Sequence, residues 1–135
     1  MICHTRVMFD ASFSISSTIA SYPAYPYKKI KEEIIGKKYQ LSLSFVGTTR
    51  AQKFNKTYRK KDYVPNVLSF PLDEVNGEII ICPKISYPEA KDFNLTKKGY
   101  IAFLFIHGLL HLKGYDHGDT MESLERRYVK KFNIK

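Results

Sequence analysis

The sequence predicts an α/β (α+β) fold in which helices pack around a small mixed β-sheet of about four strands. Three observations support this fold class. Short runs of alternating or β-branched apolar residues are interleaved with segments of helical periodicity. An Asn-Gly pair at positions 76–77 separates two of the strand-like runs. A length of 135 residues with 44% hydrophobic content fits one domain spanning residues 1–135.

The N-terminal part of the chain is expected to hold strands on either side of a helix. Residues 1–9 are a weak strand candidate, and residues 10–25, rich in Ser, Ala, Tyr and Pro, are expected to be irregular. Isoleucines at helical spacing predict a helix over 28–35, which Gly36 ends. Alternation of apolar and polar residues predicts a half-buried strand over 41–47.

The central part is expected to contain a helix followed by a β-hairpin. A threonine cap predicts a helix running to about residue 58. Apolar runs at 67–71 and 79–82 predict two antiparallel strands joined by a turn around residues 72–77. A short helix is expected to follow Pro83.

The C-terminal part is expected to form two helices. Thr96 predicts the start of a helix that runs to Leu112 or Lys113 with a largely apolar face. A last helix is expected to begin near Asp119, because Asp119 with Glu122 three positions later resembles a capping box.

The charge balance favours a polyanionic partner. The chain has 22 Lys and Arg against 13 Asp and Glu, a net charge of +9. Nucleic acid is the commonest partner for such an excess, although a solvated basic surface explains it equally well. Two cysteines, Cys3 and Cys82, without a C-x-x-C pair indicate a reducing compartment. With neither a secretory leader nor a membrane-spanning stretch visible, a cytoplasmic location is expected and no membrane partner.

Three histidines near the C-terminus are the strongest chemical signal. His107 and His111 are four residues apart and so share one face of the expected helix. Gly114 can end that helix in the left-handed conformation and return His117 towards the other two. Three neutral imidazole ligands with water in the open fourth position are typical of a catalytic zinc site. His4 lies outside this cluster and is interpreted as an ordinary histidine.

The spacing H-x-x-x-H-x-x-G-x-x-H is also that of the metzincin zinc peptidases. Those enzymes place a glutamate base directly after the first histidine, where this chain has Gly108. A metallopeptidase lacking its usual base is therefore a minor hypothesis. Asp116, beside His117, can be either an orienting carboxylate or a turn residue.

A second cluster of functional interest is basic. It comprises Lys53, Lys56, Arg59, Lys60 and Lys61. Arg59 follows Tyr58, so base stacking beside phosphate binding is one interpretation, and a solvated helix face is the other.

Several segments together resemble the YbeY family of bacterial rRNA-maturation factors, which are zinc-dependent endoribonucleases. Residues 107–117 match its H-G-x-L-H-L-x-G-Y-D-H motif, and residues 55–62 resemble its N-x-x-Y-R-x-x-D. Residues 67–71 resemble the family's V-L-S-F-P strand. The likeness runs from about residue 41 to 132. Asn66 departs from the family's aspartate before that strand, and Pro65 from a threonine.

The resemblance implies one Zn²⁺ held by His107, His111 and His117 plus water, with Arg59 and His111 required for catalysis. The implied fold is a small sheet with helices around it, the zinc helix lying beside a basic channel. The implied partners are single-stranded RNA, ribosomal RNA and the ribosome or its small subunit, and no DNA is expected.

The leading hypothesis is a single-strand-specific, zinc-dependent endoribonuclease. It would act in maturation of the 3′ end of small-subunit rRNA and in ribosome quality control. The main alternative is a non-catalytic, zinc-containing assembly factor that binds rRNA. The sequence shows no obvious general base, so attack by water and attack by the 2′-hydroxyl of the RNA both stay open.

Overall fold

The computed structural model describes residues 6–9, as backbone, and residues 12–135. Its five strands form one mixed sheet in the order β1-β2-β3-β5-β4. The strands are β1 (Arg6–Phe9), β2 (Phe13–Ser17), β3 (Gln40–Phe45), β4 (Val67–Pro71) and β5 (Asn76–Ile81). Strands β2, β3 and β5 run parallel, whereas β1 and β4 are antiparallel to their neighbours, and β4 is an edge strand. The predicted mixed sheet and the predicted hairpin are both confirmed, but Asn76 and Gly77, which were expected in the turn, lie at the start of β5.

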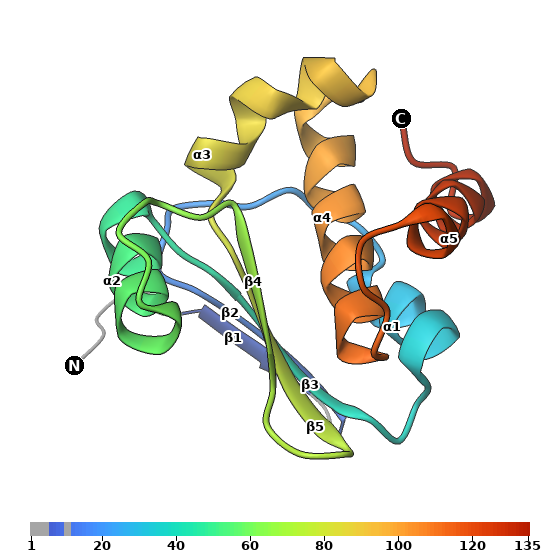
Figure 1. Cartoon of the computed structure of the whole chain (residues 1–135), viewed down its shortest axis with the longest axis horizontal. Coiled ribbons are helices and arrows are strands. Elements are labelled where there is room, and N and C mark those ends of the chain that lie inside the picture. The colour runs from blue at the N-terminus through green and yellow to red at the C-terminus, as the bar shows by residue number, and fades with distance from the viewer. Residues whose placement is uncertain (1–5, 10–11) are drawn as a thin grey trace.

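Helices cover both faces of this sheet. They are α1 (Tyr27–Ile35), α2 (Thr48–Arg59), α3 (Pro83–Ser86), α4 (Lys97–Leu112) and α5 (Asp119–Lys131), with a 3₁₀ segment, η1 (Tyr87–Phe93), between α3 and α4. Figure 1 shows α2 on one side of the sheet and α1, α4 and α5 on the other. The longest described helix, α4, has 16 residues, and none of the described helices is long and apolar enough to cross a membrane.

The two faces of the sheet bury separate apolar clusters. Ile79 and Ile81 of β5 pack in the larger cluster with α1 and α4, while Ile80 packs in the smaller cluster on the α2 side. Successive side chains of a strand point to opposite faces, so the run of three isoleucines is buried on both sides. This two-sided burial fixes where α2 and α4 lie relative to the central strands.

Strand β2 lies in the segment that was expected to be irregular, and that expectation is wrong. Phe13, Ile15 and Ser17 are buried in alternation with half-buried serines. The hydroxyls of the intervening serines lie beside those of β3, with Ser16 Oγ 3.0 Å from Ser44 Oγ. The period-two pattern therefore outweighs a serine-rich composition that is otherwise typical of loops. Cys3 and His4 lie outside the described residues.

The helix caps agree with the sequence in one case and differ in another. The side chain of Thr96 accepts a hydrogen bond from the Gly99 amide at 3.0 Å, which confirms the predicted start of α4. Gly118, not Asp119, precedes α5, and no side chain caps its first turn. Asp119 and Glu122 instead lie within that turn, where their negative charges stabilise the helix N-terminus.

Candidate metal centre and its cleft

His107 and His111 project from one face of α4 and are each held through Nδ1. The Nδ1 atom of His107 lies 2.6 Å from Oε2 of Glu125. The Nδ1 atom of His111 lies 2.9 Å from the carbonyl oxygen of Tyr115. Both partners are acceptors, so each ring carries its proton on Nδ1. A neutral ring held in this way turns an unprotonated Nε2 towards the other histidine.

These two Nε2 atoms are 3.1 Å apart. When both rings are neutral and protonated on Nδ1, neither Nε2 can donate to the other, and two lone pairs face each other at contact distance. Two nitrogens bound to one tetrahedral Zn²⁺ at 2.0–2.1 Å would be separated by about 3.3 Å. The observed separation thus suits a shared cation far better than a hydrogen bond.

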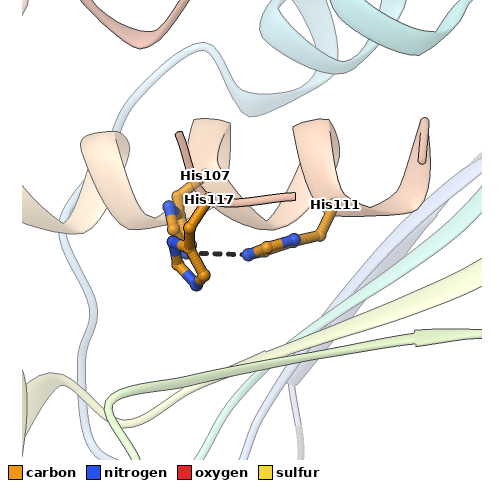
Figure 2. A group of neighbouring side chains, drawn as sticks. All are labelled: His107, His111 and His117. Atoms are coloured by element: carbon orange, nitrogen blue, oxygen red, sulfur yellow. Dashed lines mark hydrogen bonds between the residues drawn. The ribbon is translucent and has the colours of Figure 1, made fainter. Parts of the chain in front are cut away.

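His117 completes the cluster from the loop between α4 and α5. Gly114 has a φ of +102° and donates its amide to the carbonyl of His111, so it ends α4 in the left-handed region as expected. Gly118, with a φ of +150°, allows a second turn before α5. The three rings converge as Figure 2 shows, and their potential ligand nitrogens all lie within 4.8 Å of one another. Such a group can hold a metal ion.

The electrostatic surroundings favour a neutral ring at His111. Burial lowers the pKa of His111, and the neighbouring His107 and His117 lower it further. The hydrogen bond to Tyr115 and the charge of Asp116 act in the opposite direction without outweighing those effects. A neutral imidazole is the form that binds a metal ion, so this environment prepares His111 as a ligand.

Glu125 is a site residue whose role the sequence reasoning missed. It lies on α5, is only 7% exposed, and contacts His107 across the interface between α4 and α5. A carboxylate behind a ligating histidine fixes the ring orientation and strengthens its lone pair. The sequence signal was a glutamate on the otherwise apolar face of α5, four residues after Met121. Asp116, the carboxylate considered for this role, makes no hydrogen bond with any described residue.

Gly108 is required by packing where metzincins have their glutamate. A Cβ atom at this position would lie 2.9 Å from Ser69 Oγ and 3.0 Å from Ile79 Cδ1. The Ser69 hydroxyl also donates to the Gly108 carbonyl at 3.2 Å. The close approach of α4 to β4 and β5 therefore leaves no space for a catalytic side chain at this position.

Arg59 and the histidine cluster line the same cleft, which has a volume of about 560 Å³. Its described lining comprises Arg59, Tyr63, Pro65, Asn66, Val67, Leu68, Ser69, His107, His111 and His117. Arg59 ends α2, and the loop over residues 60–66, which joins α2 to the edge strand β4, contributes Tyr63, Pro65 and Asn66 to the cleft lining. The structure thus brings Arg59 and the three histidines into one depression.

The Arg59 side chain is held in place by two neighbours. Its Nη1 donates to Asn55 Oδ1 at 3.3 Å and to the Tyr63 hydroxyl at 3.2 Å. Asn55 is fully buried and also donates to the Tyr63 carbonyl. Both bonds use Nη1, so no described residue occupies the remaining guanidinium nitrogens, and these can bind a phosphate.

Asn66 has a specific structural partner at the mouth of the cleft. Its Nδ2 donates to Oε1 of Glu89 at 3.0 Å, and the Tyr100 hydroxyl donates to the same oxygen at 3.0 Å. Burial, followed by this hydrogen bond, raises the pKa of Tyr100, so its hydroxyl stays protonated. An amide at position 66 suits Glu89, whereas an aspartate there would place two carboxylates in contact.

The sequence is similar to that of one family of known proteins. The sequence model of the family described as endoribonuclease YbeY matches residues 15–133. The endoribonuclease YbeY of Finegoldia magna is 40% identical over 77% of this chain and 72% of its own length. The endoribonuclease YbeY of Neisseria meningitidis serogroup C is 33% identical over 93% of this chain and 83% of its own length.

A solved structure resembles the fold at a comparable level of identity. The solution structure of TM1509 from Thermotoga maritima superposes with a TM-score of 0.59 at 33% identity, covering 78% of this chain and 75% of that one. The family match extends over both α2 and the histidine helix, so it includes every side chain of the cleft. The chain belongs to the endoribonuclease YbeY family.

Proposed function

We propose that this chain is a zinc-dependent endoribonuclease that cuts single-stranded RNA. The relatives from Finegoldia magna and Neisseria meningitidis carry the name endoribonuclease, and the family match covers most of the chain. The observation that carries the proposal is the pair of Nε2 atoms of His107 and His111, 3.1 Å apart, in the cleft that Arg59 also lines.

His107, His111 and His117 would hold the ion as three neutral ligands. A Zn²⁺ ion so bound supplies Lewis acidity at a phosphodiester and lowers the pKa of water. Glu125 keeps the proton of His107 on Nδ1, and the Tyr115 carbonyl does the same for His111. The protein thus presents lone pairs that need no rearrangement before the ion arrives.

Arg59 is proposed to bind the phosphate next to the cut bond. Its remaining N–H groups can donate two parallel hydrogen bonds to phosphate oxygens while Asn55 and Tyr63 hold Nη1. A fixed guanidinium stabilises the negative charge that grows in the transition state. Because an A-form duplex buries its base edges and fixes its backbone, a small cleft favours unpaired RNA.

The decisive experiment is cleavage of a defined single-stranded RNA by zinc-loaded protein. Cleavage should be lost after chelation, restored by Zn²⁺, and abolished by His111→Ala. Arg59→Ala should reduce the rate by about a hundredfold or more, by analogy with the loss of one transition-state donor. Arg127→Ala removes an exposed arginine of α5 and should cleave as the wild type does. Equal cleavage by His111→Ala and wild type would disprove the assignment.

The biological setting is proposed on the resemblance. The RNA target would be ribosomal RNA, at the 3′ end of the small-subunit species, and the activity would also serve ribosome quality control. We place this activity in a single domain over residues 1–135 acting in the cytoplasm. Extension of small-subunit rRNA in cells that lack the protein, reversed by the wild type but not by His111→Ala, would support this role.

A non-catalytic assembly factor is the second candidate, and one observation favours it. None of the described residues that line the cleft is a carboxylate, so the lining offers no obvious general base. Attack by the RNA's own 2′-hydroxyl would explain the same absence within an enzyme. RNA binding without turnover at any zinc loading would select the assembly factor.

A further inference from the structure

The exposed side of α2 carries a second set of side chains suited to RNA. We call Arg50, Lys53, Phe54, Thr57 and Tyr58 the α2 strip, since their spacing places them on one face of the helix. Together with Thr49 they are the described lining of a hollow of about 550 Å³. Figure 1 shows that α2 lies across the sheet from α4, which carries two of the three histidines.

Tyr58 is an exposed aromatic ring that is nevertheless held in place. It is 64% exposed, yet its ring stacks on Phe54 with 6.0 Å between centroids and meets Phe70 of β4 at 5.5 Å. Phe54 and Phe70 in turn pack against the buried cluster on the α2 side of the sheet. A ring supported in this way is a rigid surface for stacking a nucleobase at little cost in entropy.

The charged side chains of α2 itself are all positive. Helix α2 contains Arg50, Lys53, Lys56 and Arg59 and no acidic residue. Within the described part of the chain, Arg50 and Lys53 form no ion pair, and the pairing of Lys56 with Asp62 is long and exposed at 3.8 Å. Cations that lack an internal partner and flank an aromatic ring suit a phosphate backbone with unstacked bases.

The α2 strip and the cleft are joined by neighbouring residues of α2. Tyr58 and Arg59 are consecutive, and Arg59 lines the cleft while Tyr58 belongs to the strip. The edge strand β4 separates the two, since Ser69 faces the cleft and Phe70 faces α2. An extended ligand leaving the cleft past Arg59 therefore reaches Tyr58 by crossing the edge of the sheet.

We propose that the α2 strip binds a single-stranded RNA segment outside the cleft, with a base stacked on Tyr58 and phosphates on Arg50 and Lys53. The proposal rests on the endoribonuclease function and deepens it, because the strip would hold nucleotides that flank the cut site. The enzyme would then distinguish substrates by the length of unpaired RNA on one side of the cut.

The test measures binding of labelled 2′-O-methyl oligouridines of about 4 and about 12 nucleotides by fluorescence anisotropy. Gels verify that the probes stay intact. Only the longer probe can occupy cleft and strip together. The double variant Arg50→Glu/Lys53→Glu should weaken binding of the longer probe at least about tenfold. It should also reduce the slope of log K against log salt by about 1.4, the value for two single-strand phosphates. Binding of the shorter probe should not change.

Two substitutions test whether the aromatic ring of Tyr58 is needed for binding. Tyr58→Leu keeps an apolar contact with Phe54 but has no aromatic face, and it should bind the longer probe roughly tenfold more weakly. Tyr58→Phe keeps the ring and should bind as the wild type does. Lys29→Glu/Lys38→Glu, two exposed lysines away from the strip, makes the same change in net charge and is the matched control.

Three results would overturn the proposal. The strip variants and the lysine control could lose the same affinity, or the strip variants could weaken both probes equally. A polyglutamate probe could instead depend on Tyr58 while RNA does not, which would assign the strip to an acidic protein. Failure of the wild type to cleave RNA would refute the proposed function without altering these binding results, so the two ideas are judged separately.

Discussion

Glu125 Oε2 lies 2.6 Å from His107 Nδ1, and this contact joins α5 to the candidate metal centre. The carboxylate is nearly inaccessible, and the ring it holds is partly buried. A position on the last helix of the domain thereby determines how a histidine on α4 presents its lone pair.

We expect Glu125→Gln to weaken zinc binding by about tenfold to a hundredfold, because loss of the carboxylate makes the ring nitrogen less basic and less well oriented. Competition with a chromogenic chelator measures the affinity directly. Glu122→Gln changes an exposed glutamate in the first turn of the same helix and should leave the affinity unchanged. Equal affinity of Glu125→Gln and wild type would show that the contact is only structural.

Gly108→Glu should not create a peptidase. The new carboxylate would be forced between α4 and the sheet, where Ser69 and Ile79 already limit the space to that of a glycine. We expect a loss of at least about 3 kcal/mol in the free energy of unfolding, as for an uncompensated buried charge. Urea denaturation measures it. Gly108→Ala brings a methyl group against Ser69 and Ile79 but no charge, so it should lose less than Gly108→Glu. A stable, proteolytically active Gly108→Glu protein would contradict this account.

Asn66→Asp should destabilise the protein at neutral pH and much less in acid. The new carboxylate would face Glu89 Oε1, which now accepts from the Asn66 amide at 3.0 Å. Repulsion between two carboxylates keeps a proton on the folded form, so the lost stability returns as the pH falls. The expected loss at pH 7 is about 1–2 kcal/mol. Adding Glu89→Gln should restore it, and thermal unfolding of the single and double variants across pH tests both statements.

Cys82 should resist alkylation in the folded protein. It is 1% exposed, and burial raises the pKa of its thiol, so the reactive thiolate is scarce at neutral pH. We expect N-ethylmaleimide to label Cys82 at pH 7 only as fast as the protein unfolds, and rapidly in urea. Peptide mapping by mass spectrometry resolves this site from Cys3. Rapid labelling under native conditions would mean that the cluster beneath α2 opens readily.

The sequence predicted those parts of the site that depend on local periodicity. His107, His111 and the glycine turn before His117 follow from helix geometry and from the left-handed preference of Gly114. The contact between His107 and Glu125 was not predictable, since it depends on how α5 packs against α4 across 18 residues of sequence. The same limit applies to the bond between Asn66 and Glu89, which joins positions 23 residues apart.

The fold was predictable to a similar degree. The cap of α4 by Thr96 follows from short-range capping chemistry. The hairpin of β4 and β5 was predicted from its two apolar runs, whereas the Asn76-Gly77 pair assigned to its turn lies within β5. Strand β2 was missed because its serines suggested a loop, although they lie beside the serines of β3. The placing of Arg59 beside the histidines depends on the loop over residues 60–66, and only the family resemblance implied it.

The edge position of β4 has a consequence for how the cleft can be altered by mutation. Val67, Leu68 and Ser69 line the cleft, and in the described structure β4 pairs with β5 alone. The main-chain N–H and C=O groups on the outer side of β4 are therefore available to hydrogen-bond a ligand. Every amino acid except proline supplies both groups. Side-chain exchanges along this rim would leave those contacts intact, whereas a proline would delete one outright.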